Sequence, residues 1–211
     1  DYDADGITAT TIAVRSLKEF GIEAIPVIPE RENGYGLTSG ILEEVLENYC
    51  PDLILTVDCG ISAASQIEEL ADLGVDVIVT DHHELPDELP HCVVVNCKID
   101  DGFTFNGLCG AGVAFKLAHA LIGDKADKYI DLAAIATVAD SMPLTGENRK
   151  IVAEGVKNTD SGKCCKVVKA LVKASGVKES VSATTLAYVI APRINAAGRM
   201  GNARLALKAF L

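Results

Sequence analysis

The sequence contains no apolar run long enough to cross a membrane, no cysteine pair spaced for a zinc site and no basic, apolar start. A membrane-spanning helix needs roughly 18 consecutive apolar residues, which excludes a membrane protein. The acidic first residues are unlike a secretory signal peptide. Because 49% of the 211 residues are hydrophobic, a disordered chain is excluded as well. We expect a globular, cytoplasmic protein built as one compact domain.

The cysteines do not fit a stabilising framework. There are seven of them, an odd number, and no two are arranged as Cys-x-x-Cys. Disulfide scaffolds of extracellular domains usually have an even number, and structural zinc sites draw on closely spaced pairs. We therefore expect reduced thiols that are mostly buried.

Positive charge is scarce over most of the chain. Lys and Arg total 19 against 30 Asp and Glu, which gives a net charge of −11. Nine of the basic residues nevertheless lie between residues 163 and 211, where Glu179 is the only acid. Two explanations of this basic segment stay open: the solvated face of helices, or a surface that lies along a phosphate backbone.

Runs rich in valine and isoleucine alternate with helical patterns in the first half of the chain. The strands expected from these runs cover residues 53–57, 75–80 and 92–95, with a shorter one near 23–28. Helices are expected at residues 7–20, 38–49 and 62–73, the last two with Thr38 and Ser62 as N-caps. This alternation is typical of an α/β fold, a parallel sheet covered by helices on both faces.

The second half of the chain has no strand signal. Helical patterns cover residues 112–122, 128–139, 148–158, 164–174 and 182–190. We therefore divide the chain into an α/β part, residues 1–100, and a mainly helical part, residues 101–211. Both ends look trimmed, because no strand precedes the loop at Asp1 and a helical pattern stops at Leu211. We expect a domain of a longer protein, with its first strand missing.

Acidic side chains stand where the expected strands end. Asp1, Asp3 and Asp5 open the chain in a loop that leads into a helix, Asp58 follows the strand at 53–57, and Asp81-His82-His83 follows the next strand. The carboxyl ends of parallel strands share one edge of a sheet, so these side chains should converge. Five carboxylates and two imidazoles would then lie together.

Such a group of carboxylates needs cations to offset the mutual repulsion. Carboxylate oxygens with one or two imidazoles suit Mn²⁺ or Mg²⁺ better than structural zinc, which prefers sulfur. The number of acids favours two ions, roughly 3.5–4 Å apart.

Taken singly, these motifs have simpler explanations. The loop from Asp1 to Gly6 could be a calcium loop or a polar turn, although the downstream Glu of an EF-hand is missing. Asp58-Cys59-Gly60 could be a capped turn between a strand and a helix. His119 lies on an apolar helix, where we expect it to pack rather than to bind. The combination of the three acidic motifs in this order favours catalysis.

Together with Ala139-Asp140, these motifs resemble, in order, the four motifs of the DHH phosphoesterase superfamily. Residues 34–37, 108–117 and 192–201 are similar to the exonucleases of that superfamily that act on single-stranded DNA. The resemblance implies a parallel sheet flanked by helices and a metal-dependent 5′ to 3′ exonuclease of DNA recombination and repair, with two ions of Mn²⁺ or Mg²⁺. The implied ligands are Asp5, Asp58, His82 and Asp140 for one ion, and Asp3, the bridging Asp58 and Asp1 for the other.

The implied reaction is hydrolysis by a water that bridges the ions and attacks phosphorus in line. Asp58 is catalytic in this scheme because it bridges the ions, and His83 is placed to hydrogen-bond a phosphate oxygen or to assist the leaving group. Arg193, Asn195 and Arg199 lie in the basic segment, where guanidinium groups match phosphate oxygens, although these three residues could instead tie helices to acidic loops. The residues expected to bind substrate are Arg193, Asn195, Arg199, Arg31 and Tyr35.

Exonucleases of this superfamily carry a second, DHH-associated domain, and many carry an oligonucleotide-binding domain; neither fits in 211 residues. The fragment could therefore bind metal and yet cleave DNA poorly. Through the missing domains the protein could engage single-strand-binding protein and repair helicases. Two other functions stay open: a phosphodiesterase or phosphatase acting on small nucleotides or short oligonucleotides, and a non-catalytic scaffold.

Overall fold

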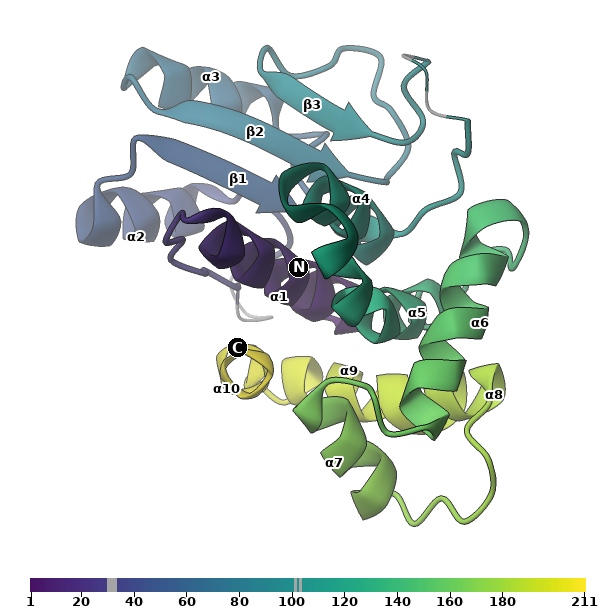
Figure 1. Ribbon diagram of the computed structural model, residues 1–211. Coiled ribbons are helices and arrows are strands. Elements are labelled where there is room, and N and C mark those ends of the chain that lie inside the picture. The colour runs from purple at the N-terminus through teal and green to yellow at the C-terminus, as the bar shows by residue number, and fades with distance from the viewer. Residues whose placement is uncertain (30–33, 101, 103) are drawn as a thin grey trace.

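The computed structural model describes residues 1–29, 34–100, 102 and 104–211. Its sheet has three parallel strands in the order β1-β2-β3, which are Leu53–Val57, Asp76–Asp81 and Val93–Asn96 (Figure 1). Thr56 pairs with Val79, and Thr80 pairs with Val95. The α/β fold class is thus confirmed, with strand ends within a residue of those expected.

The strand expected near residues 23–28 is wrong. This segment has no regular secondary structure, and among the described residues no strand pairs with it. An alternating apolar pattern supplies side chains suited to a sheet, but a strand also needs a neighbour to accept its backbone hydrogen bonds.

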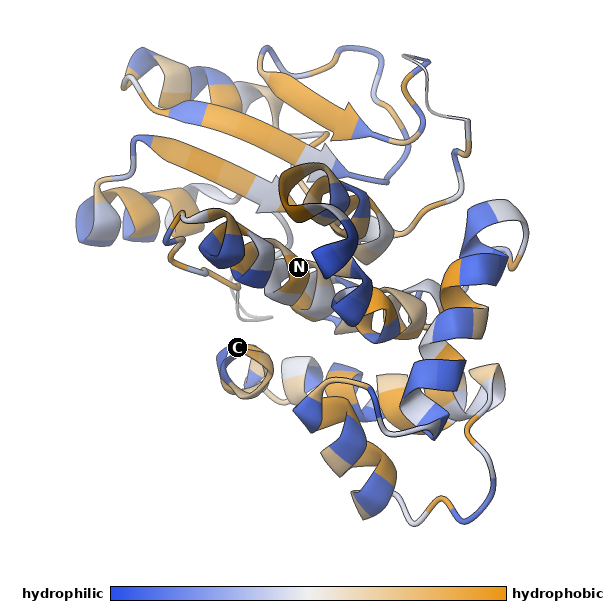
Figure 2. Ribbon diagram, in the orientation of Figure 1, coloured by the Kyte–Doolittle hydropathy of each residue, from blue (hydrophilic) through white to orange (hydrophobic). Residues whose placement is uncertain are grey.

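Helices cover both faces of the sheet. Their bounds are α1, Ala4–Phe20; α2, Ser39–Tyr49; α3, Ala64–Asp72; and α4, Gly110–Ile122. The strand side chains alternate between two apolar clusters: Val77 and Val79 pack with α2 and α3, whereas Val57 and Val95 pack with α1 and α4. Figure 2 shows why both faces need cover, since the strands are hydrophobic along most of their length.

Of the two helix N-caps expected from the sequence, one is present in the structure. Thr38 caps α2 as expected, because its side chain accepts a hydrogen bond from the backbone N–H of Ile41. Ser62 was expected to cap the next helix, and that expectation is wrong. The helix α3 begins at Ala64, and Ala63 occupies the N-cap position without any side-chain hydrogen bond.

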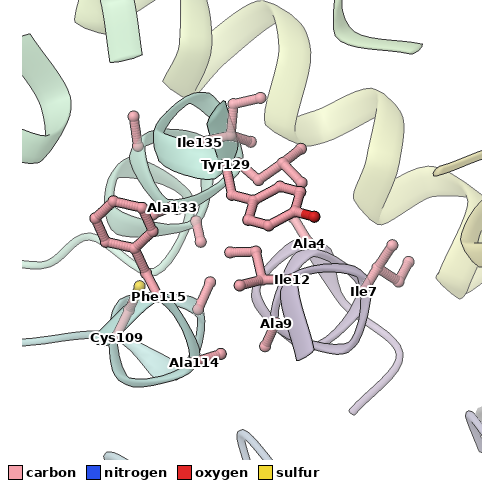
Figure 3. Close-up of a cluster of buried hydrophobic side chains, with 14 of the residues drawn as sticks. Ala4, Ile7, Ala9, Ile12, Cys109, Ala114, Phe115, Tyr129, Ala133 and Ile135 are labelled. Atoms are coloured by element: carbon pink, nitrogen blue, oxygen red, sulfur yellow. The ribbon is translucent and has the colours of Figure 1, made fainter. Parts of the chain in front are cut away.

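The second half is helical, as expected. After α4 it contains a 3₁₀ segment η2, Gly123–Tyr129, and three helices: α5, Ile130–Ala139; α6, Gly146–Asp160; and α7, Lys166–Ala174. The helix α5 is buried all round, from Leu132 to Ala136, and packs against α1 and α4 (Figure 3). At Gly155 of α6 a Cβ would lie 2.2 Å from the Cβ of Ala134, so only glycine allows this approach.

A further helix was missed around Pro192. The segments are α8, Ala183–Thr185; a π-helical turn η3, Leu186–Ile190; α9, Ala191–Arg199; and α10, Ala203–Phe210. Proline usually interrupts a helix because it has no N–H and clashes with the preceding turn. Here the π turn comes just before it, with the N–H of Ala191 donating to the carbonyl of Leu186, and Pro192 falls in the first turn of α9.

All seven cysteines are free, but they are less buried than expected. Only Cys97 and Cys109 are fully buried, and Cys50 is exposed because it ends α2 in a left-handed turn at the surface. Among the described residues, no helix combines the length and apolarity required to cross a bilayer.

Candidate metal centre

The first acidic loop is folded tightly onto the start of α1. Asp3 is the N-cap of that helix and accepts a hydrogen bond from the N–H of Gly6 at 3.0 Å. A Cβ on Gly6 would lie 2.4 Å from the carbonyl oxygen of Asp1, so the loop can return over this position only because it is glycine. Asp1, Asp3 and Asp5 therefore surround the N-terminus of α1.

Asp5 is held by the first turn of another helix. Its two carboxylate oxygens accept hydrogen bonds from the N–H groups of Gly110 at 2.8 Å and Ala111 at 2.6 Å, at the N-terminus of α4. Those N–H groups have no partner within their own helix and favour a negative charge. Burial of the side chain, and then the neighbouring Asp58, nevertheless raise the pKa of Asp5 well above its usual value.

Asp58 ends β1 in a left-handed conformation, with a φ of 61°. Its side chain is buried, and among the described residues its Oδ1 atom accepts no hydrogen bond. Burial raises the pKa of Asp58 from 3.8 to about 7. A buried carboxylate oxygen without a donor is costly unless a cation approaches it, so this atom fits a metal ligand.

His82 joins three of the acids at one point. Its Nε2 atom lies 3.1 Å from Oδ1 of Asp58, 3.7 Å from Oδ2 of Asp5 and 3.8 Å from Oδ2 of Asp140. Asp140 reaches the site from the C-terminal end of α5 and is partly exposed. The structure thus brings together all four residues that the resemblance assigns to one ion.

A second group lies beside the first. One oxygen each from Asp1, Asp3 and Asp58 lie within 4.8 Å of one another. Asp58 belongs to both groups, as a bridging ligand would. The donor set consists of carboxylate oxygens with one imidazole nitrogen, which fits hard divalent cations such as Mn²⁺ or Mg²⁺.

His83 is oriented by Asp81. Its Nδ1 atom lies 2.7 Å from Oδ1 of Asp81, whose other oxygen accepts from the N–H of Ile61 at 2.9 Å. The hydrogen bond to Asp81 raises the pKa of His83. Burial acts against ionised Asp81, but the hydrogen bonds from His83 and Ile61 outweigh it and lower the pKa of this carboxyl.

Tyr35 lies at the edge of the site and links His83 to Asp58. Its hydroxyl donates to the carbonyl oxygen of Asp58 at 3.2 Å and lies 3.1 Å from Nε2 of His83. With Nδ1 bonded to Asp81 and Nε2 in contact with Tyr35, both ring nitrogens of His83 have a hydrogen-bond partner.

The residues expected to bind substrate lie in different surroundings: some are exposed to solvent, and one faces the acidic loop. Arg193 and Arg199 of α9 are exposed, and Arg193 donates to the carbonyl of Val189 in the preceding π turn η3. Asn195 instead faces the acidic loop, where its Oδ1 accepts from the N–H of Ala4 at 2.7 Å. Arg31 lies outside the described residues. His119 packs edge-on against Phe115, as expected of a packing residue.

Two contributors were missed in the sequence. The N–H groups of Gly110 and Ala111 hold Asp5, and Gly110 also makes room for Asp58, because a Cβ on Gly110 would lie 2.3 Å from Oδ1 of Asp58. The signal available was the run Gly110-Ala111-Gly112 at the start of an apolar helix, a glycine pattern typical of close backbone approach.

Comparisons with known proteins agree with this geometry. The model of the "DHH family, N-terminal domain" matches residues 1–137. The single-stranded-DNA-specific exonuclease RecJ of Thermus thermophilus is 43% identical over 216 residues, covering 100% of this chain and 32% of that protein. The RecJ of Bacillus subtilis is 40% identical over 208 residues, covering 96% of this chain and 26% of that protein. The chain thus spans about a third or less of the length of these relatives.

Solved structures agree as well. A crystal structure of exonuclease RecJ bound to manganese superposes with a TM-score of 0.88 at 42% identity, covering 99% of this chain and 54% of that one. The structure of RecJ from Thermus thermophilus in complex with Mn²⁺ gives a TM-score of 0.83 at 40% identity, covering 100% of this chain and 31% of that one.

Proposed function

Because this chain belongs to the DHH family, we propose that it is the catalytic part of a metal-dependent exonuclease that degrades single-stranded DNA from 5′ to 3′ in recombination and repair. The observation that carries the proposal is the convergence of three acids on Nε2 of His82, one of them through a buried oxygen of Asp58 that accepts no hydrogen bond from any described residue. The similar RecJ proteins are named for this activity, and their structures hold manganese.

In this proposal Asp5, Asp58, His82 and Asp140 hold one ion of Mn²⁺ or Mg²⁺, and Asp1, Asp3 and Asp58 hold the other. The pair of ions would supply an activated water and would stabilise negative charge on the phosphoryl oxygens. Residues 1–100 and 101–211 act as one catalytic domain, since Asp140 comes from the helical part and completes a group from the α/β part.

The protein's own residues prepare the phosphate for attack. Asp81 fixes the ring of His83 and raises its pKa, which favours a proton on the ring that can pass to a phosphate oxygen or to the leaving group. Tyr35, 49% exposed, contacts Nε2 of this ring in the free protein and would shift when a strand binds. Its ring would then be available to stack on a base.

A long single strand is favoured over a small nucleotide by the distribution of positive charge. Arg193 and Arg199 are exposed on α9, and no described residue makes an ion pair with them. The neighbouring α7 region adds exposed lysines at positions 163, 166, 169, 173 and 178. An extended phosphate backbone can use such a surface, whereas a small substrate needs a closed pocket. The proposal includes a cytoplasmic location, and single-strand-binding protein and repair helicases as partners that other domains of the full-length protein would bind.

The test compares substrates with and without metal. The chain, in its natural full-length protein, is incubated with 5′-labelled single-stranded DNA, duplex DNA, a short RNA and a cyclic dinucleotide, each with Mn²⁺ or with EDTA. Release of mononucleotides from single-stranded DNA alone, and only with Mn²⁺, is expected. Turnover confined to the RNA or the cyclic dinucleotide would assign the site to small substrates, and no turnover of any of them would favour a scaffold.

A further inference from the structure

We infer that Asn195 is a positioning residue that holds the Asp3–Asp5 loop in the geometry required for metal binding, rather than a residue whose main contact is with DNA. The inference rests on the proposed metal site. Asn195 lies on α9 and is half-buried, and its side-chain oxygen Oδ1 accepts a hydrogen bond from the backbone N–H of Ala4 at 2.7 Å. The two residues are 191 positions apart in the sequence.

The N–H of Ala4 is a group that the loop cannot satisfy by itself. Ala4 is the first residue of α1, and the first N–H groups of a helix have no acceptor within the helix. The side chain of Asp3 satisfies the N–H of Gly6, which leaves that of Ala4 for an acceptor from elsewhere. Asn195 supplies it. The bond fixes the peptide that lies between Asp3 and Asp5, one ligand of each proposed ion.

A second contact, three residues along the same helix, confirms that α9 lies directly on this loop. Gly198 is buried, and a Cβ at this position would lie 2.1 Å from the carbonyl oxygen of Tyr2. Only glycine allows that approach. The helix therefore touches the backbone on both sides of Asp3, at Tyr2 through Gly198 and at Ala4 through Asn195.

The same helix carries the exposed Arg193 and Arg199. Arg193 precedes Asn195 by two residues and therefore lies on the far side of the helix from the metal loop, whereas Arg199 follows it by four residues and lies near the same face. Asn195 is the one of the three whose side chain bonds the loop. Hydrogen-bond partners behind metal ligands typically change metal affinity by 10- to 100-fold when they are removed.

The experiment measures Mn²⁺ binding directly, in the absence of DNA, by titration calorimetry on the full-length protein. Asn195→Ala is expected to lower Mn²⁺ affinity by about 10- to 100-fold. Its affinity for a single strand in EDTA, measured by fluorescence anisotropy, should stay within about twofold of the unchanged protein. Ala196→Ser, an exposed neighbour on α9, is the matched control and should leave both affinities unchanged.

Two variants separate this role from its alternatives. Arg193→Ala should weaken strand binding and leave Mn²⁺ affinity unchanged, the reverse of Asn195→Ala. Asn195→Asp keeps an acceptor oxygen at the same place and should retain Mn²⁺ binding. If circular dichroism shows that the Asn195→Ala protein is unfolded, Asn195→Leu is used in its place. Unchanged Mn²⁺ affinity in a folded Asn195→Ala or Asn195→Leu protein would overturn the inference, whatever happens to DNA binding.

Failure of the proposed function would look different. If the protein without substitutions binds Mn²⁺ but does not cleave single-stranded DNA, the proposed exonuclease activity is refuted and the role of Asn195 can still be tested by calorimetry. If that protein binds no Mn²⁺, both the proposed function and the role of Asn195 are overturned.

Discussion

Gly110 and Asp58 are in such close contact that a methyl group on the glycine would lie 2.3 Å from Oδ1 of the aspartate. The glycine stands at the start of α4 and the aspartate at the end of β1, and the N–H of the same glycine donates to Asp5. One residue without a side chain therefore sets the spacing between two acids of the candidate centre.

Replacement of Gly110 by alanine should change the spacing between Asp58 and Asp5. The added methyl group would push Asp58 aside and draw the N–H away from Asp5, so we expect Mn²⁺ affinity to fall by about 100-fold, at the upper end of the range for groups that orient ligands. Calorimetry with Mn²⁺ measures the change. Gly40→Ala, in α2 with open space around it, is the control: it should bind Mn²⁺ normally and gain up to about 1 kcal/mol of stability. Equal Mn²⁺ affinity in the two variants would refute the explanation.

Loss of the shared ligands should stop the reaction. Asp58→Ala and His82→Ala each remove atoms on which the other acids converge, and we expect cleavage of 5′-labelled single-stranded DNA to fall by roughly three orders of magnitude or more. His91→Ala removes an exposed histidine outside the acidic group, nine residues after His82, and should retain full activity. Activity of either site variant above about a tenth of the original would show that the metals are held elsewhere.

Metal affinity should increase with pH. Burial raises the pKa of Asp58 to about 7, so below that pH the metal-free carboxyl is protonated and must lose its proton before it can bind a cation. Mn²⁺ affinity is therefore expected to rise as pH increases from 6 to 8, by up to about tenfold per unit below 7 for one displaced proton. Titration calorimetry in two buffers of different ionisation enthalpy counts the protons released. No release at pH 6 would contradict the raised pKa.

Arg199 should contribute to strand binding through charge. It is exposed at the end of α9, so Arg199→Ala should weaken binding of single-stranded DNA and lower the slope of log affinity against log salt by about 0.7. Fluorescence anisotropy at several salt concentrations gives the slope, and Mn²⁺ affinity should not change. Lys150→Ala removes an exposed charge from α6 and is the control. A slope that Arg199→Ala leaves unchanged would mean that the strand does not pass this residue.

Asp131 provides a prediction about stability alone. It is buried in α5, burial raises its pKa, and one oxygen accepts from the N–H of Cys165 at 2.7 Å. A raised folded-state pKa gives stability that is present below the unfolded value of 3.8 and is lost as pH rises through the folded value. Asp131→Asn keeps an acceptor without a buried charge, so it should be stabilised relative to the original protein at pH 8, and this gain should shrink as the pH is lowered to 3. Urea unfolding at both pH values measures this, and equal gains would contradict it.

The sequence was most informative where local chemistry decides the outcome. The three strands were predictable because each is a short run of β-branched residues between turns, and the acids at their ends followed from the geometry of a parallel sheet. Asp140 was found only through the resemblance, because a carboxylate at the end of a helix has no local signal of metal binding.

Contacts between distant segments could not be predicted in the same way. The bond from Gly110 to Asp5 spans 105 residues, and that from Ala4 to Asn195 spans 191. The sequence left two roles open for Asn195, a contact with DNA or a tie between a helix and an acidic loop. Only the packing of α9 on the loop distinguishes the two, since the helix itself was hidden by Pro192.

The π turn at residues 186–190 determines which side of α9 reaches the metal loop. A turn closed over five residues rather than four holds one extra residue, so everything beyond it is rotated by about 100° relative to an uninterrupted α-helix. Removal of a single residue from this turn, such as Ala187, would leave α9 helical but turn Asn195 and Gly198 away from Ala4 and Tyr2. The rotational register set by this turn is therefore needed, in addition to Asn195 and Gly198 themselves, to keep the helix in contact with the acidic loop.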